Sequence, residues 1–294
     1  MTHPTGALVV GTVRPAGSAE RAQVRGVLAD PGLSIRFRRI CHHETGRFLI
    51  IPMDHGITVG AKGGLEDLGT RITDADRGGA TAVVLHKGEA ARYAAAAPVR
   101  AGLIIHISGS IDKAPDPNRK VLVSTVEEAL RFGADCVSVH VNIGADTTAE
   151  MISDCGAVAR ACHEWSVPLL VMVYPRGPAI KDQFEPSLVA HCARAVEELG
   201  ADIVKTNYTG DPDSFREVVR SLSVPVITAG GPPASSPLAP LEAAAGTIAA
   251  GGAGVACGRN VFGHRRPEAM TRAMAAVIFE GAPPEEAARR HLGV

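Results

Sequence analysis

Hydrophobic residues along the chain gather in short runs rich in Val, Ile and Leu, and each run precedes a stretch in which apolar residues recur every three or four positions. A short continuous apolar run is typical of a buried strand, and the longer period is typical of an amphipathic helix. Because parallel strands need crossover connections, the alternation predicts a parallel sheet. We expect strands at residues 48–53, 82–86, 102–107, 136–141, 169–173, 203–206, 224–229 and 254–257, and helices at 65–77, 89–97, 125–132, 149–164, 187–199, 213–221, 241–250 and 267–279.

Glycine recurs where an expected helix passes into the next strand, at residues 78–80, 133–135, 200–202 and 252–254. A glycine at this place adopts the left-handed conformation that ends a helix. Eight such units without a Gly-x-Gly-x-x-Gly motif predict a closed (β/α)8 TIM barrel in a single domain. Residues 1–32 lack periodicity and are expected to form a flexible N-terminal extension, with the barrel domain at residues 33–294.

Composition narrows the class of protein. Hydrophobic residues make up 46% of the 294 residues and aromatic residues only 4%, so aliphatic side chains must fill the core. The 30 Lys and Arg balance 31 Asp and Glu, and no basic stretch is interleaved with aromatic residues, which argues against a nucleic-acid partner. No apolar run is long enough to span a bilayer. The six cysteines form no Cys-x-x-Cys pair, so we expect reduced, mostly buried thiols in a cytoplasmic protein.

Polar residues follow nearly every expected strand, and barrel active sites lie at these carboxyl ends. Lys205 ends a strongly apolar strand, where loss of hydration favours the neutral amine, which can attack a ketone and form an iminium. The alternative is a lysine that reaches solvent or pairs with an acid. Asp54 and Tyr174 end other strands of the same mouth and favour the catalytic interpretation.

Asp54 and Tyr174 each have two interpretations. Asp54 is expected to accept a proton or hold a substrate hydroxyl, or else to form an ion pair with Lys205 or Arg176 without chemistry. Tyr174 is expected to donate a proton to a carbinolamine or alkoxide, since a phenol can act as a general acid in a desolvated site. Its alternative is a core tyrosine with a satisfied hydroxyl.

Glycine-rich segments follow the last two expected strands, where barrels commonly bind phosphate. Gly230, Gly231 and Gly258 let backbone N–H groups approach an anion, and Arg259 adds positive charge; two plain tight turns are the alternative. Four histidines also lie near strand ends and are expected to contact substrate hydroxyls or to pack in the core, with a metal site as the less favoured alternative. They are His55, His86, His106 and His140.

Seven stretches together resemble the archaeal-type class I aldolases, which include fructose-1,6-bisphosphate aldolases and 2-amino-3,7-dideoxy-D-threo-hept-6-ulosonate synthases. The resemblance covers approximately residues 33–280. The loop after the seventh expected strand departs from the pattern, because Gly-Gly-Pro is followed by proline and not by the family's lysine. The stretches are IPMDHG at 51–56, VLHKG at 84–88, VSVHVNIG at 137–144, MVYPRG at 172–177, DIVKTNYTG at 202–210, AGGP at 229–232 and GRNVF at 258–262.

The resemblance implies a Schiff base on Lys205, a proton acceptor at Asp54 and a proton donor at Tyr174, with neither a metal nor a cofactor. It implies phosphate binding by Gly230, Gly231, Gly258 and Arg259. Further residues are expected to contact the substrate. They are His55, Gly56, Ile57, Thr58, His86, His140, Pro175, Arg176, Thr206 and Asn207.

The implied activity is that of an aldolase or transaldolase acting on a phosphorylated ketose and an aldehyde. The segments around His86, His140 and Lys205 are more similar to the heptulosonate synthases, which use L-aspartate semialdehyde as acceptor. Alternatives are a fructose-1,6-bisphosphate aldolase and a dihydroxyacetone phosphate/aspartate semialdehyde aldolase of aminobenzoate biosynthesis. A metal-dependent lyase and a non-catalytic phospho-sugar-binding barrel are less favoured. The resemblance also implies a homo-oligomer such as a decamer.

Overall fold

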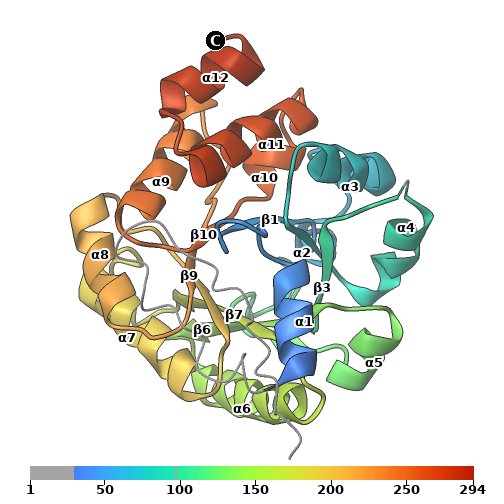
Figure 1. Ribbon diagram of the computed structural model, residues 1–294. Helices are drawn as coiled ribbons and strands as arrows, with labels where there is room; N and C mark the ends of the chain where they lie inside the picture. Colours follow the sequence, from blue (N-terminus) through green and yellow to red (C-terminus); the bar gives the residue numbers. More distant parts are fainter. Residues whose placement is uncertain (1–29, 97) are drawn as a thin grey trace, which may run out of the picture.

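The computed structural model describes residues 30–96 and 98–294 (Figure 1). Within these residues, eight parallel strands close into a barrel in the order β1-β10-β9-β8-β7-β6-β3-β2. This confirms the predicted TIM barrel, and each barrel strand overlaps an expected one. The barrel strands are β1 (Phe48–Pro52), β2 (Ala82–Leu85), β3 (Gly102–His106), β6 (Cys136–Ile143), β7 (Leu169–Pro175), β8 (Ile203–Thr206), β9 (Val226–Ala229) and β10 (Gly254–Ala256).

Helices surround the barrel in a ring, as Figure 1 shows. The expected helices are all present, some divided into two segments. They are η1 (Leu65–Asp67) with α3 (Leu68–Arg77), η2 (Lys87–Glu89) with α4 (Ala90–Ala95), α5 (Val126–Arg131), α6 (Thr148–Glu164), α7 (Pro186–Glu198), α8 (Pro212–Arg220), α9 (Leu238–Ala249), and α11 (Pro267–Ala275) with the π-helical turn η3 (Ala276–Glu280).

Other elements were not expected from the hydrophobic pattern. Most are too short to show a period, and α1 spans the expected boundary between the extension and the barrel domain, because it begins at Pro31, two residues before the expected start. Residues 1–29 of the expected extension lie outside the described residues, so that part of the prediction stays open. These elements are α1 (Pro31–Arg39), α2 (Gly56–Val59), the antiparallel pair β4 (Ser108–Gly109) and β5 (Val121–Leu122), α10 (Arg259–Phe262) and α12 (Pro284–Leu292).

Short sequence signals set the ends of several helices. An acidic side chain followed by proline begins α1, α7 and α8; at α1 the Asp30 carboxylate accepts a hydrogen bond from Leu33 N at 3.1 Å. The expected left-handed glycines occur at the helix-to-strand joints, with φ of 83° at Gly133 and 102° at Gly200. At the last joint the left-handed residue is Gly251, one position before the expected segment.

One end of the barrel interior is closed by α1, which lies across it in Figure 1. The Phe37 ring meets the Phe48 ring edge-on with centroids 5.6 Å apart, and Ile40 is fully buried. Phe48 begins β1, so α1 covers the amino ends of the strands. Above it the interior is filled with aliphatic side chains such as Ile104 and Ile203. The opposite end of the barrel, at the carboxyl ends of the strands, contains a cavity.

Two further observations bear on the predicted class. All six cysteines lie within the described residues and are free; five are buried and Cys41 is half-buried, as expected. In the part of the chain that the structure describes, no helix has the length and apolar character needed to cross a membrane.

Candidate active site

A cavity of about 480 Å³ opens at the carboxyl ends of the barrel strands. Residues at the ends of all eight strands line it, which is the arrangement that the strand-end residues predicted. Three expected contact residues, Gly56, Pro175 and Thr206, do not line it. Successive side chains on a strand point to opposite faces, so Pro175 and Thr206 face the helices where Tyr174 and Lys205 face the interior. The expected residues that line the cavity are Asp54, His55, Ile57, Thr58, His86, His140, Tyr174, Arg176, Lys205, Asn207, Gly230, Gly231, Gly258 and Arg259.

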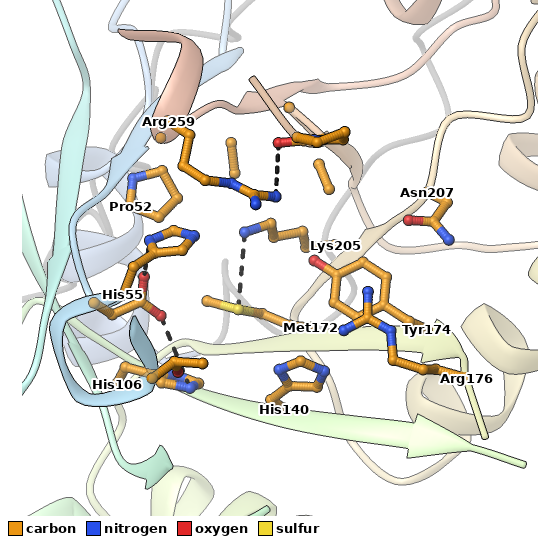
Figure 2. Close-up of a pocket in the computed structure, with 18 of the residues that line it drawn as sticks. Pro52, His55, His106, His140, Met172, Tyr174, Arg176, Lys205, Asn207 and Arg259 are labelled. Carbon is orange, nitrogen blue, oxygen red and sulfur yellow. Dashed lines mark hydrogen bonds and ion pairs between the residues drawn. The ribbon is translucent and has the colours of Figure 1, made fainter. Parts of the chain in front are cut away.

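Lys205 reaches the cavity from β8, and only 6% of the residue is exposed. Its partner across the strand pair is Met172 of β7, and Lys205 Nζ lies 3.8 Å from Met172 Sδ (Figure 2). Among the described residues no carboxylate lies within 4.0 Å of Lys205 Nζ, so the amine is not engaged in the ion pair with Asp54 that was the alternative. The amine is buried and faces the cavity, and the Met172 sulfur is its one hydrogen-bond partner among the described residues.

Asp54 follows β1 and lies between two histidines (Figure 2). Its Oδ1 is 3.4 Å from His55 Nδ1 and its Oδ2 is 3.9 Å from His106 Nε2. Burial alone would raise the pKa of Asp54, but the neighbouring His55, His106 and Lys205 outweigh burial and hold that pKa below its usual range. The carboxylate is therefore ionised at neutral pH and can accept a proton.

His106 supports Asp54 from β3. Its Nδ1 lies 2.9 Å from Ser138 Oγ and its Nε2 lies 3.4 Å from Ser108 Oγ, so the ring is held between two hydroxyls and the carboxylate. Burial lowers the pKa of His106 to about 4, which leaves the ring neutral at neutral pH. A neutral ring has one N–H to donate and one lone pair to accept with, which suits this position.

Tyr174 is the penultimate residue of β7, and its hydroxyl points toward Lys205 in Figure 2. The ring meets the His140 ring edge-on at 5.1 Å, and the Arg176 guanidinium lies 5.2 Å from the Tyr174 ring centroid. His140 Nε2 lies 2.8 Å from Asn142 Oδ1, and burial holds the pKa of His140 well below its usual value. Tyr174 is 6% exposed, so its ring is fixed while its hydroxyl faces the nucleophile.

The two glycine-rich segments lie side by side at the rim. A Cβ on Gly230 would stand 2.5 Å from Cys257 Sγ, and one on Gly258 would stand 2.5 Å from Pro52 O, so both positions need glycine for close packing. Arg259 Nη2 donates to Gly231 O at 2.9 Å and joins the two segments (Figure 2). The arrangement brings together the residues expected to bind phosphate.

Several residues that line or support the cavity were not predicted from the sequence. Lys120 and Ser110 come from the segment between β4 and β5, whose irregular sequence showed no recognisable signal. Asn260 donates from Nδ2 to Gly230 O at 2.8 Å and to Pro232 O at 3.0 Å, so it organises the expected phosphate loop from the start of α10. No group of three or more His, Cys, Asp or Glu residues within 30–96 and 98–294 has the arrangement to hold a metal ion.

Comparison with known proteins shows the family of this chain. Residues 48–264 match the model of the DeoC/LacD family aldolases. The chain is 43% identical over 245 residues to a 2-amino-4,5-dihydroxy-6-oxo-7-(phosphonooxy)heptanoate synthase of Streptomyces griseus, covering 83% of this chain and 89% of that protein. It is 41% identical over 265 residues to a 2-amino-3,7-dideoxy-D-threo-hept-6-ulosonate synthase of Halobacterium salinarum, covering 90% and 97%.

Solved structures of class I aldolases are also similar to this chain. An archaeal fructose 1,6-bisphosphate aldolase superposes with a TM-score of 0.79 at 31% identity, covering 85% of this chain and all of that one. Another structure of an archaeal fructose-1,6-bisphosphate aldolase, with its catalytic lysine bound to the carbinolamine intermediate, gives 0.77 at 30% identity and covers 84% and 99%.

Proposed function

Because this chain belongs to the DeoC/LacD family and is a class I, Schiff-base aldolase, we propose that it joins a three-carbon unit from a phosphorylated ketose to L-aspartate semialdehyde. The observation that carries the proposal is the buried Lys205 amine, which shares a cavity with Asp54, Tyr174 and the glycine-rich rim. The two synthases above are 41–43% identical to this chain, against 30–31% for the fructose-1,6-bisphosphate aldolases, which supports a synthase-like reaction.

The identity of the acceptor is inferred from the product that gives the Streptomyces relative its name. An aldol bond joins the carbon next to a ketone to a carbon bearing a hydroxyl. In that product, breaking the bond between C4 and C5 leaves aspartate semialdehyde and dihydroxyacetone phosphate. A heptulosonate synthase reaction uses the same acceptor and takes its three-carbon unit from a 1-deoxy-diulose phosphate. Both relatives therefore support aspartate semialdehyde as acceptor, and they differ in the donor.

We assign the steps to the cavity residues as follows. As the free base, the Lys205 amine adds to the donor ketone to form a carbinolamine, and Tyr174 gives its proton to the hydroxyl, which leaves as water. The resulting iminium loses a proton to give an enamine. In the diulose case a carbon–carbon bond breaks instead, and the remainder of the diulose leaves as an aldehyde after its hydroxyl loses a proton. The enamine attacks the acceptor aldehyde, and water then releases the product from Lys205. Asp54, ionised at neutral pH, accepts the proton or holds a substrate hydroxyl.

The donor phosphate is placed at the rim formed by Gly230, Gly231, Gly258 and Arg259. Backbone N–H groups at closely packed glycines approach an anion without steric hindrance, and the Arg259 charge attracts it. Because the rim and Lys205 line the same cavity, a donor whose phosphate binds at the rim can present its ketone to Lys205.

A covalent trap tests the nucleophile. Borohydride added with dihydroxyacetone phosphate or a 1-deoxy-diulose phosphate should reduce the iminium and leave a stable adduct on Lys205, measured by mass spectrometry of the intact protein and its peptides. Lys205→Met should give no adduct and no turnover, whereas the control Lys181→Met, altered at an exposed loop lysine outside the cavity lining, should behave as wild type. An active Lys205→Met protein would refute the proposal.

The acceptor is tested by crossing both donors with L-aspartate semialdehyde and glyceraldehyde 3-phosphate. We expect the higher kcat/KM with aspartate semialdehyde. A clear preference for glyceraldehyde 3-phosphate would instead support a fructose-1,6-bisphosphate aldolase, the activity of the structural relatives.

A cytoplasmic homo-oligomer such as a decamer is part of the proposal, on the basis of the family resemblance. Large apolar side chains exposed on the described surface, among them Phe132 at 43% and Trp165 at 46%, support burial between subunits. Light scattering after size-exclusion chromatography would measure the subunit number, and a monomer would contradict this part.

A further inference from the structure

Two cationic side chains share the rim of the cavity without an acidic partner. Lys120 and Arg176 both line it, and among the described residues neither has a carboxylate oxygen within 4.0 Å. Lys120 Nζ donates to Ser110 Oγ and, at 3.2 Å, to Pro117 O. The Arg176 guanidinium lies over the Tyr174 ring. Both charges therefore face the cavity without forming an ion pair, and Asp54 and Asp116 act on Lys120 only through space, from beyond 4.0 Å.

The two charges act on one another. Burial, and after it the charge of Arg176, lowers the pKa of Lys120 to about 8. Holding two positive charges together in a partly buried place is unfavourable, and an anion bound between them removes the repulsion and gains charge-assisted hydrogen bonds. The arrangement suits a carboxylate or phosphate group.

The segment that carries Lys120 is anchored on both sides. Asp112 N donates to Thr58 O at 3.1 Å, which ties the segment to the short helix α2 that follows β1. Asn142 Nδ2 donates to Asn118 O at 2.7 Å, which ties it to β6. Two anchors, one on α2 and one on β6, place Lys120 at the cavity as a defined part of its wall.

The pair lies apart from the expected phosphate rim. Figure 2 shows Arg176 and Arg259 on different sides of Lys205, with Tyr174 on the Arg176 side. Resting on the proposed function, we propose that Lys120 and Arg176 form a second anion subsite, which binds the anionic end of the acceptor aldehyde. The donor phosphate occupies the Arg259 side, and Lys120 is the residue that selects acceptors carrying an anionic group.

Acceptor selectivity tests this inference. We would compare kcat/KM for L-aspartate semialdehyde, glyceraldehyde 3-phosphate and the uncharged glycolaldehyde with one donor, in wild type, Lys120→Met and Lys120→Arg. Lys113→Met is a matched control on the same segment, since the Lys113 side chain is 87% exposed and does not line the cavity.

Lys120→Met should lower the preference for the anionic acceptor over glycolaldehyde by about ten- to a hundredfold, mainly through KM, because a hydrogen-bonded charge is lost. Lys120→Arg should restore most of the preference, and Lys113→Met should match wild type. The anionic acceptor that loses most identifies the group bound, carboxylate or phosphate.

Equal losses with charged and uncharged acceptors, or no loss with either charged one, would overturn the inference. Borohydride trapping of donor on Lys205 separates this failure from a failure of the proposed function. A wild-type adduct together with unchanged selectivity in Lys120→Met refutes only the acceptor subsite, whereas absence of the wild-type adduct refutes the proposed function itself.

Discussion

Asn260 offers a sharp test of how the phosphate rim is built, because one side chain holds three backbone groups. Its Nδ2 donates to Gly230 O at 2.8 Å and to Pro232 O at 3.0 Å, and its Oδ1 accepts from Ala234 N at 2.7 Å. The segment it holds includes Gly231, whose φ of 67° gives the turn its shape. Asn260→Ala removes all three bonds without altering any residue expected to contact the donor.

The size of the effect follows from those bonds. A hydrogen bond contributes about 1 kcal/mol net, so three contribute up to about 3 kcal/mol. The segment is mostly exposed, so water replaces part of the hydrogen bonding that Asn260→Ala removes. We therefore expect the variant to lose about 1.5–2 kcal/mol of the free energy that orders this loop. Because about 1.4 kcal/mol is tenfold in affinity, we expect the donor KM to rise about 10- to 30-fold.

Steady-state kinetics with each substrate varied in turn is the assay. The donor KM should rise while the acceptor KM stays within about threefold, because Asn260 lies on the Arg259 side of the cavity. Asn260→Asp is the companion variant: it keeps the acceptor for Ala234 N, loses both donors and adds a negative charge beside the phosphate, so its donor KM should rise further. An unchanged donor KM in Asn260→Ala, or equal rises for both substrates, would refute the reasoning.

Three more predictions concern separate parts of the barrel. Tyr174→Phe should lower kcat by about 10²- to 10⁴-fold with a smaller change in KM, because it removes the proposed proton donor; an unchanged kcat would contradict that role. His106 has a pKa of about 4 when folded against 6.5 for the free side chain, so the unfolded state binds more protons between these values and stability falls as pH drops from 6.5 to 4. Urea unfolding should show a loss of about 3 kcal/mol from this group that is absent in His106→Gln, and identical pH profiles would refute it. Phe37→Ala should cost about 3 kcal/mol of stability with kcat unchanged, since Phe37 packs at the closed end of the barrel; a large fall in kcat would show that α1 shapes the cavity.

Most barrel elements could be predicted from local sequence because their physical causes are local. A buried parallel strand is a short apolar run, an outer helix is amphipathic, and glycine such as Gly133 or Gly200 ends the helix between them. The elements that were missed, such as α2 and the β4–β5 pair, are too short to have a period. They are held by contacts to other segments, as Asp112 N is held by Thr58 O.

The candidate site likewise contains residues that local sequence predicts and residues that only tertiary contacts bring together. The sequence by itself determined that Lys205, Tyr174 and Asp54 share one mouth, because parallel strands of a barrel all end on the same side. Only the tertiary structure decided what surrounds them. Barrel register sets Met172 opposite Lys205, and strand order brings His106 to Asp54. Lys120 enters from an irregular segment and Asn260 from the four-residue helix α10; their positions depend on hydrogen bonds between distant segments, which leave no periodic pattern in the sequence.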